Sequence, residues 1–295
     1  MNIINQPENH PIIIPDINPE KERPQTDDRV VYCDQCGMPK NKWIPPGPVL
    51  GSGKYVPILC KCDLDRMKKL TDERAFREHE DRKKRLYQQA SFPASLKEET
   101  FENAENYQSK AMNYAKEYAE TLVNDPTFSD GLCLHGSCGT GKTYIAACIG
   151  NYLIDHLKTV YFNSIGQLLT QFSCSHFQFE NNISPIIFMN SFLDYRLVIL
   201  DDLGTEYANS YNLSLLFQLI NFLDLNKIPM VITTNLSTDE IQKPSDQNAR
   251  RIYDRILGRC TLLTVDGDDI RVKKATERIK KEKEKILKQT QNPTN

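Results

Sequence analysis

One short stretch of the chain has the residue types and the spacing of a phosphate-binding loop. Residues 136–143 read Gly-Ser-Cys-Gly-Thr-Gly-Lys-Thr and match G-x-x-x-x-G-K-[ST] at every fixed position. Glycines let backbone N–H groups approach phosphate oxygens closely, and a following helix would point its positive end at them. The pattern predicts that Lys142 reaches the β- and γ-phosphates of ATP and that the Thr143 hydroxyl binds Mg2+. The predicted nucleotide contacts are Gly136, Ser137, Cys138, Gly139, Thr140, Gly141, Lys142 and Thr143.

Two carboxylates and an amide follow apolar, strand-like segments further along the chain. Residues 197–202 read Leu-Val-Ile-Leu-Asp-Asp, an apolar strand that ends in two acids. Beside a phosphate-binding loop, Asp201 is expected to hold Mg2+ through water, and Asp202 to orient or deprotonate the attacking water. Asn235 directly follows the apolar segment 231–234. Its amide could hydrogen-bond the γ-phosphate or the same water, and an ordinary turn asparagine is the alternative.

Two arginines downstream share one face of an expected helix. Arg251 and Arg255 are four residues apart, so their side chains lie on the same side of a helical segment. Arginines in this arrangement could reach the γ-phosphate bound by a neighbouring subunit and act as fingers supplied in trans. A solvated helix with internal ion pairs explains the spacing equally well, so the spacing leaves both interpretations open.

Four of the nine cysteines form two tight pairs near the N-terminus. Four thiolates suit tetrahedral Zn2+, and a small domain of about 35 residues with little core would obtain most of its folding free energy from the metal. We therefore expect a closed, structural zinc site, with unmetallated thiols as the alternative. Its predicted ligands are Cys33, Cys36, Cys60 and Cys62.

The pattern of apolar and helix-forming residues places these groups in an α/β protein. Expected strands lie at 131–135, 160–163, 197–201 and 229–234, and expected helices at 143–157 and 212–225. Composition then predicts the domains. They are a flexible tail over 1–28, a four-cysteine zinc-binding module over 29–64, a charged helical linker over 65–90, an ATPase domain over 91–270 and a basic tail over 271–295.

The overall composition is that of an ordinary globular protein. Hydrophobic residues make up 39% of the chain and charged residues 26%, with a net charge of -2. The apolar runs are far shorter than the roughly 20 residues that a bilayer span requires, so no membrane partner is expected. The N-terminus lacks the basic and apolar parts of a secretory signal. We therefore expect a cytoplasmic protein whose cysteines are free thiols or metal ligands.

Taken together, the motifs resemble those of a known family, the bacterial DnaC and DnaI helicase loaders and the related IstB transposition helpers. The resemblance covers about residues 92–275 and implies an AAA+ P-loop NTPase with a parallel central sheet and a reduced or absent lid. It rests on Phe92-Pro, Thr100-Phe-Glu-Asn, the segment 131–143, Leu200-Asp-Asp-Leu-Gly, Thr233-Thr-Asn-Leu and Arg251-Ile-Tyr-Asp-Arg-Ile.

The resemblance also implies an activity and partners. It implies binding of ATP and Mg2+, slow ATPase activity, and self-assembly beside a replicative ring helicase on single-stranded DNA. The family's arginine finger matches Arg255, with Arg251 as a neighbour, and Arg271 resembles its second sensor. Asp202 stands where most AAA+ proteins have Glu, so the base is one methylene shorter and we expect slow hydrolysis. A DnaI-type loader also carries an N-terminal zinc module that docks on the helicase.

Three functions follow from these motifs, and the sequence favours the first. They are a helicase loader, an IstB-type ATPase helper of transposition, and an adaptor that binds nucleotide without hydrolysing it. The cysteine module favours the loader. A Phe-rich segment between 164 and 195 could stack DNA bases or could simply pack in the core, and the sequence does not separate these two roles.

Overall fold

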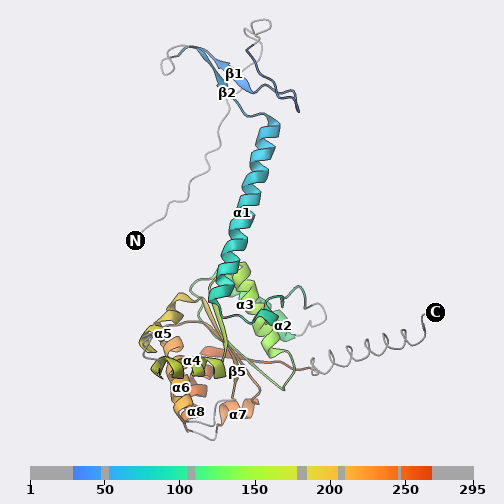
Figure 1. Cartoon of the computed structure of the whole chain (residues 1–295). Coiled ribbons are helices and arrows are strands. Elements are labelled where there is room, and N and C mark those ends of the chain that lie inside the picture. The colour runs from blue at the N-terminus through green and yellow to red at the C-terminus, as the bar shows by residue number, and fades with distance from the viewer. Residues whose placement is uncertain are drawn as a thin grey trace, which may run out of the picture. The chain divides into compact units, whose positions relative to one another are not determined.

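The computed structural model describes residues 29–47, 53–104, 110–177, 185–204, 210–244 and 247–267. The chain divides into two compact units, residues 1–76 and 77–295, and the division lies within the long helix α1 (Lys61–Gln89) (Figure 1). The tails predicted over 1–28 and 271–295 lie outside the described residues. In the described part, no helix combines the length and the apolarity needed to cross a bilayer.

A parallel sheet forms the centre of the second unit. Among the described residues it has five strands in the order β4-β5-β6-β3-β7, and every neighbouring pair is parallel. The strands are β3 (Gly131–His135), β4 (Val160–Ser164), β5 (Leu197–Leu203), β6 (Met230–Thr234) and β7 (Cys260–Thr264). Most are near-continuous apolar runs, as expected for strands covered on both faces. The predicted α/β class with a parallel central sheet is confirmed.

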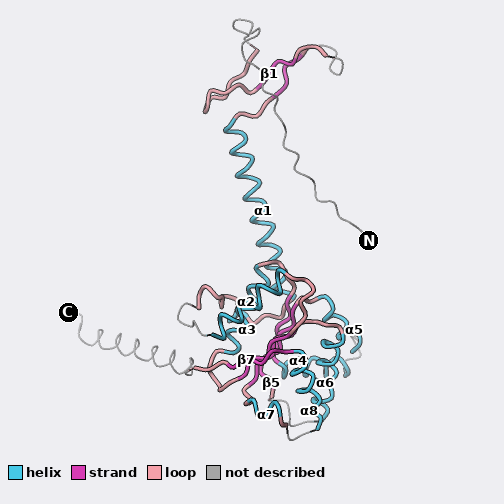
Figure 2. The backbone as a smooth tube through the Cα atoms, turned by 180° about the vertical axis from the view of Figure 1, so that it is seen from behind, coloured by secondary structure: helices cyan, strands magenta, loops and turns pink. Residues whose placement is uncertain are grey.

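Helices cover both faces of this sheet (Figure 2). On one face α3 packs against the strands and α2 packs against α3; on the other lie α4, α6 and α8. Alternate residues of β5 enter opposite cores, since Leu197 and Ile199 belong to one and Val198 and Leu200 to the other. The helices are α2 (Lys110–Asn124), α3 (Lys142–Asp155), α4 (Ile165–Phe177), α5 (Pro185–Ser191), α6 (Ser210–Leu225), α7 (Thr238–Gln242) and α8 (Gln247–Arg259).

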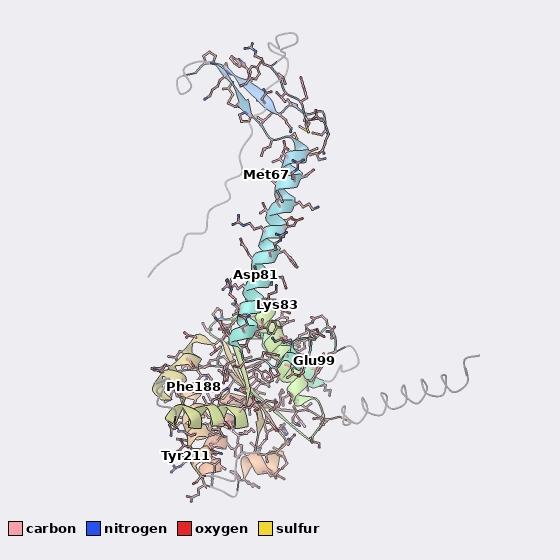
Figure 3. The ribbon with its side chains drawn as sticks, viewed as in Figure 1. Met67, Asp81, Lys83, Glu99, Phe188 and Tyr211 are labelled. Carbon is pink, nitrogen blue, oxygen red and sulfur yellow. The ribbon has the colours of Figure 1, made fainter. Side chains whose placement is uncertain are left out.

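The C-terminal turns of α1 belong to the second unit and are attached to α3. The Tyr87 hydroxyl donates a hydrogen bond of 2.9 Å to Asn151. Lys83, which Figure 3 labels on α1, pairs with Asp155. The Asn151 side chain also donates to the carbonyls of Leu96 and Glu99. These contacts join the segment that precedes the parallel-sheet domain to helix α3, which begins at the end of the loop 136–143.

The described part of the first unit contains a small hairpin and few buried residues. Strands β1 (Asn41–Ile44) and β2 (Lys54–Pro57) pair in antiparallel fashion, with Trp43 opposite Tyr55. Across the described residues of this unit, 29–47 and 53–76, only Cys33 and Cys60 are buried. The described residues of this unit therefore form no apolar core, and a fold built from them needs another source of stability.

Candidate functional site

The sequence motifs converge at the carboxyl edge of the sheet. Strand β6 lies between β3 and β5, so the ends of three adjacent parallel strands bring together the loop 136–143, the acid pair and Asn235. Ligands of open parallel sheets bind at this edge because loops and helix N-termini gather there. The structure therefore brings the loop, the acid pair and Asn235 together, whereas Arg251 and Arg255 are not among the groups gathered at this edge.

The loop 136–143 has the backbone that its glycines predict. Gly136, Gly139 and Gly141 have φ values of 147°, 82° and 98°, a region that L side chains rarely adopt. A Cβ on Gly136 would lie 2.5 Å from the carbonyl oxygen of Val265, which follows β7. The Val265 N–H donates to the carbonyl of His135 at 2.8 Å, so the strand end and the start of the loop are packed directly against the chain after β7.

Lys142 and Thr143 begin helix α3 and contact different parts of the site. Lys142 is buried, and its ammonium group donates to the carbonyls of Gly136 at 2.8 Å and Ser137 at 2.6 Å. The Thr143 hydroxyl donates to an Asp201 carboxylate oxygen at 2.9 Å. The lysine cation therefore lies inside the curve of the loop, and the threonine hydroxyl lies against the acid at the end of β5.

Thr233 contacts both acids, although the sequence motif that contains it assigned it no role. Its hydroxyl donates to Asp201 at 2.6 Å and accepts from the Asp202 backbone N–H at 2.9 Å. Burial raises the pKa of Asp201, while the hydroxyl bonds from Thr233 and Thr143 act in the opposite direction. The sequence carried one signal for the contact between Thr233 and the acids. It was the pair of threonines at the end of the apolar strand β6.

Asp202 is turned out of the regular strand. Its φ is 67°, and the pairing of β5 with β6 shifts register between Leu200 and Leu203. Bulges of this kind re-aim a side chain and are common beside active sites. The Asn235 amide donates to Asp202 at 3.2 Å, so the predicted base is in direct contact with the amide that could bind the γ-phosphate or the attacking water.

His135 is a second residue that sequence reasoning missed. It is the last residue of β3, is buried, and forms a 3.0 Å hydrogen bond with the hydroxyl of Thr264. Burial lowers the pKa of His135; the nearby Lys142 charge also lowers it, whereas Asp266 raises it. The signal for it was a polar residue at the end of an otherwise apolar strand, immediately before the first loop glycine.

The four cysteine sulfurs of the first unit form a second candidate site. All four Sγ atoms lie within 4.8 Å of one another. A tetrahedral Zn2+ with Zn–S bonds of about 2.3 Å places sulfurs about 3.8 Å apart, so the donor set fits such an ion. The turn after Cys33 is built by Gly37 at φ 68°, and the Met38 backbone, by hydrogen bonding, lowers the pKa of Cys36 to about 6.

Comparison with known proteins identifies the family. The protein-family model described as IstB-like ATP binding protein matches residues 63–278, more than half of the chain. The chain belongs to this family. The AAA+ class expected from the motifs is thereby confirmed, as is the resemblance to the DnaC and IstB proteins. All four cysteines of the cluster lie before the matched residues.

Similar proteins include helicase loaders and a transposon protein. The chain is 26% identical over 165 residues to the replicative helicase loader DnaC of Buchnera aphidicola subsp. Baizongia pistaciae, which covers 56% of this chain and 64% of that protein. It is 30% identical over 142 residues to the insertion sequence IS232 putative ATP-binding protein of Bacillus thuringiensis subsp. berliner, covering 47% and 54%. Thus the chain spans less than two thirds of either relative. A crystal structure of the DnaC helicase loader is 21% identical with a TM-score of 0.48, covering 59% of this chain and all of that one.

In this IstB-like protein the two arginines differ in environment. Arg255 donates to the Asn221 side chain at 2.9 Å, and its guanidinium lies 4.4 Å from the centre of the Phe217 ring. Phe217 and Asn221 lie about 10 and 16 Å along α6 from its first residue. Arg251 is exposed. The predicted second sensor, Arg271, lies outside the described residues.

The Phe-rich segment of this family member is partly a core element. Phe192 is fully buried and packs edge-on against Phe188 and Tyr161. The side chains of Phe172 and Phe177 and all of Phe179 lie outside the described part. Core packing therefore accounts for Phe192.

Proposed function

We propose that this protein is a helicase loader of DNA replication, an ATP-dependent switch that binds a replicative helicase and single-stranded DNA. One observation carries the proposal. The loop 136–143, the acid pair and Asn235 lie at one sheet edge in a chain of the IstB-like family that is similar to curated helicase loaders. A loader acts on replicating DNA, so the proposal includes a cytoplasmic location.

The residues at the sheet edge suit the binding of Mg-ATP. The loop N–H groups and Lys142 would hold the phosphates, and Thr143 and Asp201 would hold the ion directly or through water. The Thr143 hydroxyl lies 2.9 Å from Asp201, which supports the proposal that both side chains bind the same Mg2+ ion. Bound Mg2+ would neutralise charge on the β- and γ-phosphates.

The contact between Asp202 and Asn235 supports hydrolysis, and we propose that it is slow. Asp202 would orient or deprotonate the attacking water, and Asn235, which donates to that carboxylate, would fix its direction. The bulge turns Asp202 away from the regular strand direction. An aspartate is one methylene shorter than a glutamate at this position, so its reach to the water is shorter.

Assembly into an oligomer would complete the site. In the proposed function Arg255 reaches the ATP of a neighbouring subunit, with Arg251 beside it, and Arg271 contacts the chain's own nucleotide. The contacts of Arg255 with Asn221 and Phe217 support a guanidinium held in a defined position on its own subunit. A held arginine loses less side-chain entropy when it meets a phosphate.

The cysteine cluster is proposed to be a structural zinc site. Its four positions are all protein thiols, so no position remains for water or substrate. Because only Cys33 and Cys60 are buried among the described residues of this unit, the ion would replace a hydrophobic core.

A second candidate function is supported by the IS232 protein. An IstB-type helper of transposition would share the ATPase core and would act with a transposase. The cysteine module, which lies almost wholly before the residues matched by the family model, favours the loader.

A co-purification experiment separates the candidates. Immobilised replicative helicase from the same organism should retain the chain when ATP is present and retain much less of the Lys142→Ala variant. The Lys116→Ala variant, altered at an exposed position on α2, should behave as wild type. Retention by a transposase, with none by the helicase in any nucleotide state, would replace the loader by the transposition helper.

A further inference from the structure

The β1–β2 hairpin carries an exposed pair of aromatic side chains. Trp43 and Tyr55 are directly opposite each other in the pairing, with ring centroids 5.1 Å apart at an interplanar angle of 54°. The Trp43 side chain is 45% exposed. Since Cys33 and Cys60 are the only buried residues in the described part of this unit, Trp43 does not serve a hydrophobic core.

One side of the indole is supported by backbone. A Cβ at Gly53 would overlap the Trp43 ring and would lie 3.0 Å from the Cδ of Pro46. A glycine in or beside a strand often marks such a close approach. The Trp43 ring is therefore held by Gly53 and Tyr55 while nearly half of its surface remains open.

A positive charge lies beside this pair. The Arg29 guanidinium lies 5.5 Å from the centre of the Tyr55 ring. Residues 41–57 contain no acidic residue, and their exposed lysines, Lys42 and Lys54, alternate with Trp43 and Tyr55 along the strands and so belong to the opposite face of the hairpin. Aromatic rings beside cations are the combination that single-stranded nucleic acids require, because bases stack on the rings and phosphates pair with the cations.

We infer that the hairpin face formed by Trp43 and Tyr55, with Arg29 beside it, binds single-stranded nucleic acid. Bases stack on Trp43, and Arg29 pairs with the phosphate backbone. Duplex DNA is a poor ligand because its bases are stacked on one another. This contact belongs to the first unit and depends neither on ATP nor on the proposed helicase-loader function.

The chain contains a built-in probe of this contact, because Trp43 is its only tryptophan. Zinc-loaded, full-length protein is titrated with a dye-free oligothymidylate, and the tryptophan emission is recorded. A parallel titration follows the anisotropy of the same oligonucleotide carrying a dye. We expect quenching of Trp43 emission that saturates with the anisotropy. Anisotropy that saturates while the emission stays constant would place the DNA elsewhere on the chain and overturn the inference.

Variants separate stacking from simple charge attraction. Trp43→Ala and Tyr55→Ala should each weaken oligothymidylate binding by about tenfold, and Trp43→Phe, which keeps a ring, should weaken it less. Arg29→Gln should lower both the affinity and its salt dependence. Lys116→Gln removes the same charge from an exposed position on α2 and should change neither. Zinc content is measured for each variant, so that a loss of fold is recognised.

Two further ligands identify what the face recognises. Inorganic polyphosphate should compete with the oligonucleotide without quenching Trp43; equal quenching by polyphosphate would overturn the stacking contact. An emission change that occurs only when the helicase is added, and never with oligonucleotide, would show a protein-docking face and would also overturn the inference. Because ATPase activity and helicase retention are measured separately, failure here leaves the proposed function untouched.

Discussion

The two candidate sites of this chain are held together in opposite ways. The groups at the sheet edge stand on strands buried between two apolar cores, whereas the cysteine site lies in a unit whose described residues bury only Cys33 and Cys60. In the first case hydrophobic burial positions polar side chains; in the second, as proposed, the cysteine thiolates would supply the stability by binding a metal. On this proposal, ligand binding follows from a stable fold at one site and is required for folding at the other.

Removal of metal should therefore have the largest effect, and only on the first unit. Purified protein should contain about one zinc per chain, and a chelator or Cys33→Ser should abolish the chemical-shift dispersion of residues 29–60. The thermal unfolding midpoint and the ATP affinity of the second unit should stay unchanged, because its cores do not include these residues. Protein prepared without chelator that contains no metal would remove the distinction between the two units.

Loss of the loop lysine should abolish nucleotide binding while leaving the fold intact. Lys142→Ala removes the cation that bonds the carbonyls of Gly136 and Ser137, so useful ATP binding should be lost, as isothermal titration would show. The midpoint of unfolding should move little, since the cores around α3 are apolar. Lys116→Ala provides a matched control. An affinity within a few fold of wild type would sink the assignment of the loop.

The arginine on α8 tests whether the sheet-edge site is complete within one chain. Arg255→Ala should leave nucleotide binding by an isolated chain nearly intact and lower the ATPase activity of the assembly. Arginine fingers in efficient NTPases contribute about 10³-fold or more, and a slow loader should show a smaller loss.

Mixing variants makes this test sharper. A mixture of Arg255→Ala chains and Asp202→Asn chains should recover part of the ATPase activity. Some interfaces in the mixture then pair an intact Asp202 with an intact Arg255. If the two variants co-assemble and no activity returns, the contacts of Arg255 with Asn221 and Phe217 are better explained as packing within its own subunit.

The smallest expected effect concerns the threonine that holds both acids. Thr233→Val removes the hydroxyl bonds to Asp201 and to the Asp202 N–H, and a hydrogen bond to a charged group contributes about 1.5 to 3 kcal/mol. ATPase activity should fall by about tenfold, with a higher Mg2+ requirement. Thr234→Val is the control, since the Thr234 hydroxyl donates to the Leu203 carbonyl rather than to an acid and its loss should mainly affect stability. Equal Mg2+ titrations for the two variants would exclude a role for Thr233 in the site.

The sequence by itself determined the groups whose function depends on local spacing. The loop 136–143, the acid pair after the apolar part of β5 and Asn235 after β6 were all predicted, because each motif follows an apolar strand directly and parallel strands end at a common edge. The two cysteine pairs were predicted from their spacing, since thiols two or three residues apart are already close along the chain.

Only the tertiary structure decided which side chains meet across that edge. The place of β6 between β3 and β5 puts Thr233 against Asp201, and the bulge after Leu200 turns Asp202 toward Asn235. Likewise, the partners of His135 and Arg255 come from segments 129 and 34 residues away in the chain. Such contacts depend on strand order, register and helix packing, which are set by the burial of the whole apolar surface and leave little trace in any short stretch of sequence.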